Sequence, residues 1–221
     1  MRIGGLQKFS LIDYPKKLSC AIFTQGCNFR CPFCHNPELV YPYLFKETIP
    51  CEGIFKFLEK RKGQLEGVVI TGGEPTIHKD LIGFIEKIKA FGYFIKLDTN
   101  GSNPFMLKKI IECKLVDFIA MDIKAPLEKY NILAGVEVNL YAVLQSIEII
   151  RKSKINYEFR TTYVTSLLDE VDISKIKKMI EDEEKYKIQE FITPRDSIGK
   201  LIVDKKLGTT QNHLYPLPFQ F

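Results

Sequence analysis

Three of the six cysteines in this 221-residue chain lie close together, at Cys27, Cys31 and Cys34. The N-terminus lacks the apolar run of a secretory signal. We therefore expect a compartment in which thiols stay reduced and closely spaced cysteines bind metal. Iron–sulfur clusters are normally held by four thiolates, and no fourth cysteine follows at a similar spacing. The spacing predicts a [4Fe–4S] cluster with one iron atom lacking a protein ligand, an open position typical of a reactive metal site.

The same cysteines allow a second interpretation, a zinc site completed by His35. This interpretation is weaker, because His35 directly follows Cys34 and the paired spacing of zinc ligands is missing. The other three cysteines are isolated, and we expect all of them to pack in the core, as free cysteines commonly do: Cys20, Cys51 and Cys113. His78 and His213 have no motif around them and are predicted to be ordinary surface or loop residues.

Short apolar segments alternate with amphipathic ones along the chain. The apolar segments are continuous, as expected of parallel strands covered on both faces. They predict six strands: Leu18–Thr24, Gly67–Thr71, Tyr93–Leu97, Val116–Met121, Tyr157–Val164 and Ile188–Ile192. The segments between them carry apolar residues at helical spacing. They predict five helices: Ile54–Lys62, Asp80–Phe91, Phe105–Cys113, Leu140–Lys152 and Val171–Tyr186.

Strands that alternate with helices predict a mostly parallel α/β fold in a single domain. A complete eight-stranded barrel typically needs about 250 residues, so the chain length favours a partial, TIM-like (β/α)6 barrel. A doubly wound open sheet is the alternative. We assign residues 1–195 to this core. Residues 196–221 contain Pro216 and Pro218 and show little periodicity, and we expect them to form a C-terminal tail packed on the core.

The composition indicates a globular protein, with 45% hydrophobic and 27% charged residues. No apolar run approaches the roughly 18 residues that span a bilayer, so we expect no membrane association and a cytoplasmic protein. The net charge of +5 comes from 32 basic and 27 acidic residues that are intermixed along the chain. A nucleic-acid-binding groove would need clustered basic residues, so we expect no nucleic-acid partner.

Short motifs that contain polar residues follow the predicted strands, at the edge where parallel α/β barrels place active sites. They are Gly72, Gly73 and Glu74 after the second strand, Asp98 and Asn100 after the third, and Asp122, Ile123 and Lys124 after the fourth. Gly-Gly-Glu-Pro is by itself only a turn signal. Asp122 and Lys124 are two residues apart and therefore point to one face of a strand, where buried charges need partners. Glu158 and Arg160 have the same spacing, and a structural ion pair explains them as well as a ligand contact does.

The cysteine motif, with Phe33 just before its last cysteine, resembles the signature of the radical S-adenosylmethionine (SAM) superfamily. The segments Gly72-Gly73-Glu74-Pro75, Asp98-Thr99-Asn100-Gly101 and Asp122-Ile123-Lys124 are similar to further motifs of that family. Residues 5–15 and 34–39 resemble activating proteins of glycyl-radical enzymes, first those of anaerobic ribonucleoside-triphosphate reductase and then those of pyruvate formate-lyase. The resemblance runs from the N-terminus to about Pro194.

The resemblance implies an oxidoreductase that binds one [4Fe–4S] cluster and SAM. In such enzymes the amino and carboxylate groups of SAM chelate the open iron, and reductive cleavage gives methionine and a 5′-deoxyadenosyl radical. That radical removes hydrogen from a glycine of a partner glycyl-radical enzyme, and a flavodoxin- or ferredoxin-type protein donates the electron. The implied SAM contacts are the backbone of Phe33, Cys34 and His35 for the adenine, Gly72, Gly73 and Glu74 for the ammonium, Asp98, Asn100, Asp122 and Ile123 along the site, Lys124 for the carboxylate, and Arg160 for the nucleoside or carboxylate.

Two alternatives stay open. A small-molecule radical SAM enzyme of the 7-carboxy-7-deazaguanine synthase type shares the short partial barrel. A zinc- or cluster-binding module without catalytic activity would use the same cysteines, although the residues at the strand ends argue against it. Cys51 is the only cysteine between Cys34 and Gly72, so the segment lacks ligands for a further cluster and we predict a single one.

Overall fold

The structure, a computed structural model, describes residues 1–192. Within them seven strands form one sheet in the order β1-β2-β3-β4-β5-β6-β7. The strands are β1 (Ile3–Ser10), β2 (Ser19–Thr24), β3 (Gly67–Gly72), β4 (Phe94–Thr99), β5 (Phe118–Asp122), β6 (Asn156–Tyr163) and β7 (Tyr186–Glu190). β1 pairs with β2 in antiparallel orientation, and the later neighbours all pair in parallel.

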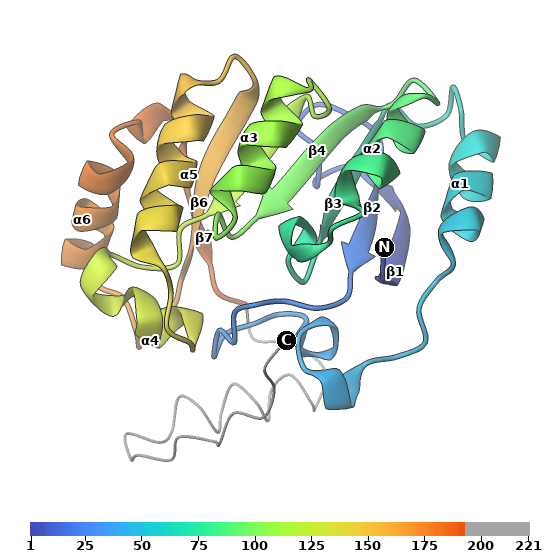
Figure 1. The fold of residues 1–221 in the computed structure, drawn as a ribbon. Helices are drawn as coiled ribbons and strands as arrows, with labels where there is room; N and C mark the ends of the chain where they lie inside the picture. The colour runs from blue at the N-terminus through green and yellow to red at the C-terminus, as the bar shows by residue number, and fades with distance from the viewer. Residues whose placement is uncertain (193–221) are drawn as a thin grey trace.

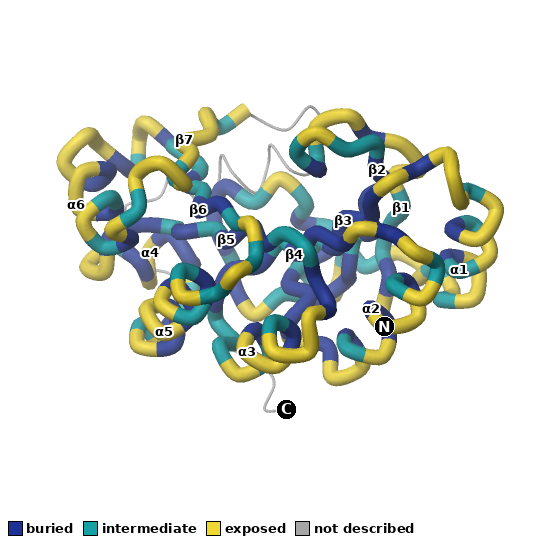
Figure 2. Tube along the Cα trace, turned by 90° about the horizontal axis from the view of Figure 1, so that it is seen from above, coloured by how far each residue is buried: buried dark blue, intermediate teal, exposed yellow. Residues whose placement is uncertain are grey.

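The helices lie between successive strands in the chain. They are α1 (Cys51–Lys60), α2 (Leu81–Lys89), α3 (Pro104–Glu112), α4 (Tyr130–Ala134), α5 (Leu140–Lys152) and α6 (Glu170–Ile180). Figures 1 and 2 show α2, α3 and α5 together on one face of the sheet. The strand order never reverses, whereas a doubly wound sheet reverses at its switch point. The fold is therefore the predicted single-domain partial barrel, and the doubly wound alternative is wrong.

Alternate residues of each strand point to opposite faces of the sheet. On β3, Val68 and Ile70 join the main core beneath the helices, while Val69 joins a small cluster with Tyr14 and Ala21 on the other face. We call that other face, opposite the helices, the inner face. Because both faces are covered, these strands read as continuous apolar runs.

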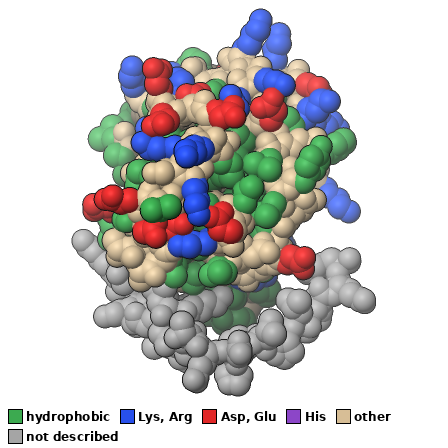
Figure 3. Space-filling view, turned by 90° about the vertical axis from the view of Figure 1, so that its left-hand side faces the viewer, with side chains coloured by type: hydrophobic (Ala, Val, Ile, Leu, Met, Phe, Trp, Pro, Cys, Tyr) green, Lys and Arg blue, Asp and Glu red, His purple; other side chains and the backbone are tan. Residues whose placement is uncertain are grey.

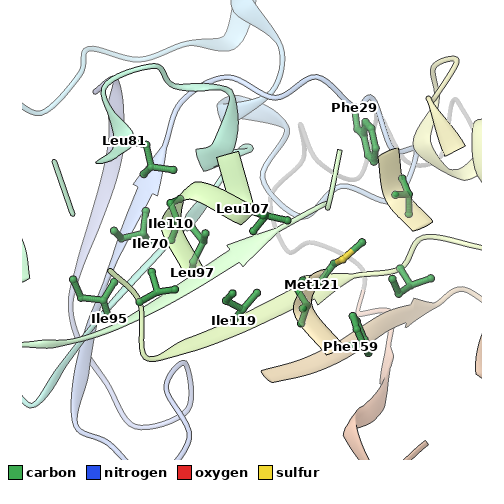
Figure 4. Close-up of a cluster of buried hydrophobic side chains, with 14 of the residues drawn as sticks. Phe29, Ile70, Leu81, Ile95, Leu97, Leu107, Ile110, Ile119, Met121 and Phe159 are labelled. Carbon is green, nitrogen blue, oxygen red and sulfur yellow. The ribbon is translucent and has the colours of Figure 1, made fainter. Parts of the chain in front are cut away.

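The main core lies between the sheet and the helices, as Figure 4 shows. Strand residues such as Leu97, Ile119 and Phe159 pack there, all of them fully buried. Leu107 and Ile110 of α3 lie over them. The apolar stripe of each helix thus faces the sheet and leaves its other side to solvent.

One strand was absent from the prediction. β1 has two glycines, Gly4 and Gly5, which are poor strand formers, and only Ile3 and Ser10 at its ends are buried. It forms because it can pair with the free edge of β2, and no local sequence pattern predicts that tertiary contact. The predicted last strand, Ile188–Ile192, lies two residues too late, since Tyr186 already pairs with β6.

The predicted helix Val171–Tyr186 is too long. α6 ends at Ile180, and Glu181 follows in a left-handed conformation with φ 50°. Residues 181–184 are all acidic, and negative charge at a helix C-terminus is unfavourable because of the helix dipole. The short helix α4 was also missed, since five residues are too few for a periodic signal.

Two side chains lie where they were not expected. Cys113, predicted to be in the core, is exposed beside the end of α3. His78, predicted at the surface, is buried with 8% exposure, because the 3₁₀ turn Pro75–Ile77 leads the chain inward before α2. Cys20 is fully buried as predicted, and Cys51 is half-buried. His213 and the proposed tail, residues 196–221, lie outside the described residues.

Charged residues of both signs cover the surface. Figure 3 shows basic and acidic side chains intermixed on the side of the molecule where α6 lies. Pairs such as Lys177 with Glu183 occur there, and exposed pairs of this kind contribute between zero and about 1 kcal/mol. Among residues 1–192, no helix combines the length and apolar character needed to cross a bilayer.

The packing of α2 on the sheet predicts a stability difference between two substitutions on this helix. Ile85 is fully buried, whereas Glu86 is exposed. Ile85→Ala should lower the free energy of unfolding by about 3 kcal/mol, since it removes buried methylene groups and leaves a cavity. Glu86→Ala should change it by less than about 0.5 kcal/mol. Urea unfolding of the metal-free proteins, followed by circular dichroism, measures both, and equal stabilities would contradict this packing.

Candidate functional site

The three clustered cysteines lie on the loop after β2, which in Figure 1 runs along the lower rim of the sheet towards α4. Phe29 and Phe33 of this loop are both 3% exposed and anchor it in the core. Gly26 opens the loop with φ 108°, a conformation that glycine adopts without strain. Its N–H donates to Leu39 O at 2.7 Å, which closes the loop on itself.

A single pocket brings the cysteines and the strand ends together. Its lining comes from the loop after β2 (Cys27, Phe29, Cys31, Phe33, Cys34, His35, Asn36 and Val40), from β3 and the turn after it (Thr71, Gly72, Gly73 and Glu74), from the ends of β4 and β5 (Asp98, Thr99, Asn100, Asp122 and Lys124) and from β6 (Thr162). Of the predicted site residues, Ile123 and Arg160 do not line it. Ile123 packs in the core, and its N–H donates to Arg160 O at 2.7 Å.

The end of β3 approaches the start of the cysteine loop at backbone distance. Gly73 N–H donates to Thr24 O, and Glu74 N–H donates to Gly26 O, each at 2.8 Å. A Cβ atom on Gly73 would lie 2.0 Å from Gly26 O, and one on Gly72 would lie 2.4 Å from Thr24 N. Only glycine fits at either position, so the sequence Gly72-Gly73 leaves a cradle of bare backbone beside Cys27.

Glu74 connects three segments of the site through hydrogen bonds. It is 1% exposed, and its Oε1 accepts from Thr76 N at 3.0 Å and from Thr99 Oγ1 at 2.8 Å. Its Oε2 accepts from Asn100 N at 2.7 Å. Burial raises the pKa of this carboxyl, and the hydrogen bonds from Thr76 and Asn100 oppose the rise. Glu74 therefore braces β3 against β4, a role that the turn motif did not reveal.

Asn28 extends this bracing to the cysteine loop and was missed by the sequence reasoning. Its Oδ1 accepts from Asn100 Nδ2 at 2.9 Å, and its Nδ2 donates to Ser102 Oγ at 2.8 Å. The only sequence signal is an amide side chain directly after Cys27. Thr162, which also lines the pocket, could have been found from its spacing of two from Arg160 on one strand.

A chain of ion pairs crosses the inner face at the ends of β4, β5 and β6. Arg160 is at its centre, with Nη2 2.9 Å from Asp122 Oδ1 and 3.5 Å from Asp98 Oδ2. Lys96 Nζ lies 2.6 Å from Asp98 Oδ1, and Lys124 Nζ lies 3.1 Å from Asp122 Oδ2. Each carboxylate is therefore held between two cations. Lys96, which is 2% exposed, was missed, although it is the one cation in the apolar segment that forms β4.

Glu158 is a minor partner of Arg160. Its Oε1 lies 3.9 Å from Arg160 Nη1, while its Oε2 pairs with Lys187. The ion pair expected between Glu158 and Arg160 is thus the longest of the contacts that Arg160 makes. Asp122 takes the leading place because it accepts from both Nε and Nη2 of the guanidinium.

This pairing keeps the groups beside the pocket charged. Burial acts to raise the pKa of Asp122, but Arg160 and Lys124 outweigh it and lower that pKa to about 2. Burial acts to lower the pKa of Lys124, but Asp122 and Cys31 outweigh it and the pKa lies above its usual value. Lys124 is therefore an ammonium at neutral pH, and it lies close enough to Cys31 to interact with it electrostatically.

The residues of the pocket fit an iron–sulfur cluster better than a zinc ion. Burial raises the pKa of Cys27 to about 12 and that of Cys34 to about 11, so a metal centre would have to displace their protons. Zinc needs its ligands around one point at about 2 Å, and His35, the fourth ligand of that interpretation, directs its Nε2 to Ile192 O at 2.9 Å instead. A cubane takes its thiolates on separate iron atoms and needs no common point.

His35 has another role than that of a zinc ligand. Its Nε2 lies 2.9 Å from Ile192 O, and its ring lies 5.1 Å from that of Phe191. Phe33 contacts the same Phe191 ring edge-on at 6.4 Å. The loop beside Cys34 is thereby attached to the segment that follows β7.

The comparisons with known proteins agree with this geometry. A Methanocaldococcus jannaschii protein, provisionally named a glycyl-radical enzyme activating enzyme, is 36% identical over 201 residues, which cover 88% of this chain and 81% of that protein. A second protein of that organism, with the same provisional name, is 29% identical over 202 residues, covering 89% of this chain and 75% of its own.

A solved structure is also similar in fold. The structure of anSMEcpe with bound AdoMet, which is SAM, superposes with a TM-score of 0.59 at 17% identity and covers 76% of this chain and 50% of that chain. The family model described as the radical SAM superfamily matches residues 21–182, a range that contains all three clustered cysteines and the ends of β3 to β6. The chain therefore belongs to the radical SAM superfamily.

Proposed function

We propose that this radical SAM protein activates a glycyl-radical enzyme. The observation that carries the proposal is the pocket in which three cysteines face a bare backbone cradle and the Lys124 ammonium. The names of the two relatives support the choice of partner. When bound, one [4Fe–4S] cluster and SAM would supply the 5′-deoxyadenosyl radical that removes an α-hydrogen from a glycine of the partner.

The residues of the pocket divide the binding of SAM among them. Cys27, Cys31 and Cys34 would hold the cluster and leave one iron open. The SAM ammonium has three donors and needs acceptors, which the backbone carbonyls around Gly72 and Gly73 can provide without steric hindrance. Glu74 Oε2 accepts one hydrogen bond among the described residues and can accept another.

The charged end of the pocket would hold the SAM carboxylate. Lys124 offers a compact cation there, and Asp122, which is itself held by Arg160, keeps it in place. Arg160 is itself outside the pocket lining, so we assign it this positioning role rather than a contact with SAM. The backbone of Phe33, Cys34 and His35 would lie against the adenine.

The remaining participants follow from the chemistry. Reductive cleavage consumes one electron, which we assign to a flavodoxin- or ferredoxin-type donor. The hydrogen leaves the partner as an atom, so no side chain of this protein needs to act as a general base. Asp122, whose pKa of about 2 keeps it ionised, serves as a counter-ion.

Substitution of one proposed cluster ligand should have an effect that substitution of a cysteine outside the pocket does not. Cys34→Ala should lose the cubane absorbance and the reductive formation of 5′-deoxyadenosine, because only two thiolates would remain to hold the cluster. Cys113→Ala, which changes an exposed thiol outside the pocket, should keep both. Iron analysis and chromatography of anaerobic reactions measure the two readouts. Normal deoxyadenosine yield from Cys34→Ala would end the proposal.

A second pair of variants tests the backbone cradle. Gly73→Ala places a Cβ atom 2.0 Å from Gly26 O, and the required shift should cost about 1–3 kcal/mol. This shift would displace the backbone carbonyl that we assign to the SAM ammonium, and because a loss of 1.4 kcal/mol in binding is a factor of ten, SAM affinity should fall about tenfold. Gly83→Ala on α2 meets no atom within 4 Å and should leave affinity unchanged. Anaerobic titration calorimetry measures both, and equal affinities would show that the cradle does not contact SAM.

The identity of the partner class has its own test. The reconstituted protein, mixed anaerobically with SAM, a reductant and a candidate glycyl-radical enzyme, should give the doublet of a glycyl radical in electron paramagnetic resonance. A partner with alanine in place of the radical glycine should give none. If SAM cleavage instead depends on a small molecule and no candidate protein yields a doublet, the small-molecule class of enzyme is correct and this assignment of the partner is wrong.

A further inference from the structure

Tyr130, the first residue of α4, carries a buried hydroxyl without a normal hydrogen bond. Its side chain is fully buried, and the hydroxyl has no hydrogen-bond partner within residues 1–192. An unsatisfied buried polar group costs about 1–3 kcal/mol, and native proteins retain few of them. The hydroxyl oxygen lies beside the Lys124 backbone, so the group that lacks a partner is the O–H donor.

The helix that carries Tyr130 is clamped to the cysteine loop. Arg30 N–H donates to Ala134 O at 2.7 Å. Gly135, which ends α4 with φ 68°, approaches so closely that a Cβ atom there would lie 2.1 Å from Arg30 O. Arg30 directly precedes Cys31, so α4 and this cysteine are held together by two backbone contacts. Figure 1 shows the loop meeting α4 at the rim of the sheet.

The surroundings of the hydroxyl favour one acceptor for its proton. The ionisable groups that act on it electrostatically are Lys124, Cys31 and Asp122. An ammonium such as Lys124 has no acceptor. Asp122 is already engaged by three cationic donors, since Oδ1 receives Nε and Nη2 of Arg160 and Oδ2 receives Nζ of Lys124. The sulfur of Cys31, whose loop is clamped to α4, is the acceptor that the arrangement favours, a weak one as a thiol and a stronger, charged one as a thiolate ligand of iron.

We propose that the Tyr130 hydroxyl donates a hydrogen bond to the Cys31 thiolate of the loaded protein and thereby raises the reduction potential of the cluster. The inference rests on the proposed function, since it requires Cys31 to be an iron ligand. Hydrogen bonds to cluster sulfurs stabilise the more negative, reduced state and so raise the potential. Tyr130 is in this sense a positioning residue that acts through Cys31 and does not touch SAM.

Redox titration of the reconstituted protein tests the inference directly. Tyr130→Phe removes the hydroxyl and keeps the ring, and it should move the midpoint potential to a more negative value. A change of up to about tenfold in the reduction equilibrium is about 59 mV for this one-electron couple. Pulsed electron–nuclear double resonance in H₂O and D₂O should also show one exchangeable proton coupling fewer in Tyr130→Phe than in the unmodified protein.

Tyr186→Phe is the matched control. Tyr186 also has a buried hydroxyl with no hydrogen bond of normal geometry. The pKa of Tyr186 responds to burial and to Thr161, and no clustered cysteine contributes to it. The cluster of the Tyr186→Phe variant should have the midpoint potential and the proton couplings of the unmodified protein. A purely structural effect of losing a buried hydroxyl would move both variants alike and would overturn the inference.

A third protein keeps the test decisive if Tyr130→Phe does not fold. Site-specific 3-fluorotyrosine at position 130 keeps the hydroxyl and makes it a stronger donor, so the potential should rise. No cubane in the unmodified protein would refute the proposed function itself. A cubane whose potential is the same with phenylalanine or fluorotyrosine at position 130 would refute only the role of Tyr130.

Discussion

Two backbone hydrogen bonds hold the functional site together, those from Gly73 N–H to Thr24 O and from Glu74 N–H to Gly26 O. They join the end of β3 to the turn after β2 without a side chain between them. Cys27 follows Gly26 directly, so its position depends on a main-chain contact and not on the packing of a flexible side chain. Glu74 then carries the constraint to β4 through Asn100.

The ion pairs of the inner face are a second, more costly constraint. Desolvation of buried charges can exceed their mutual attraction, so these groups are weak evidence of stability. Their arrangement is better explained by the pocket they border. Arg160 lies between Asp98 and Asp122, and Asp122 in turn holds Lys124. Under the proposed function, the cation for the SAM carboxylate would be in place before SAM binds, which would reduce the reorganisation needed on binding.

Much of this arrangement was predictable from the chain, for a physical reason. Parallel strands buried on both faces appear in the sequence as long apolar runs. The residues directly after such strands meet at one rim of the sheet, so Gly72, Asp98 and Asp122 could be grouped from the sequence alone. What could not be predicted depends on contacts distant in sequence. β1 forms only because β2 leaves an edge, and Arg160 prefers Asp122 to Glu158 because the neighbouring strand brings Asp122 closer.

Local charge explains other differences between prediction and structure. The acidic residues 181–184 end α6 early, and no apolar period marks that change. Cys113 is exposed because it follows the last residue of α3, and its residue type alone suggested burial. In the site, Asn28 and Lys96 were missed because a single polar residue has no pattern to be recognised by.

The alternation of charged and apolar residues on β4 has a consequence for how the strands find their pairing. Lys96 and Asp98 lie on the inner face, while Ile95 and Leu97 are in the core beneath the helices. A slip of β4 by one residue against its neighbours would exchange the two sets. Two charges would then enter the apolar layer without Arg160 to pair with Asp98. The ion chain of the ligand pocket therefore also selects the correct strand register during folding.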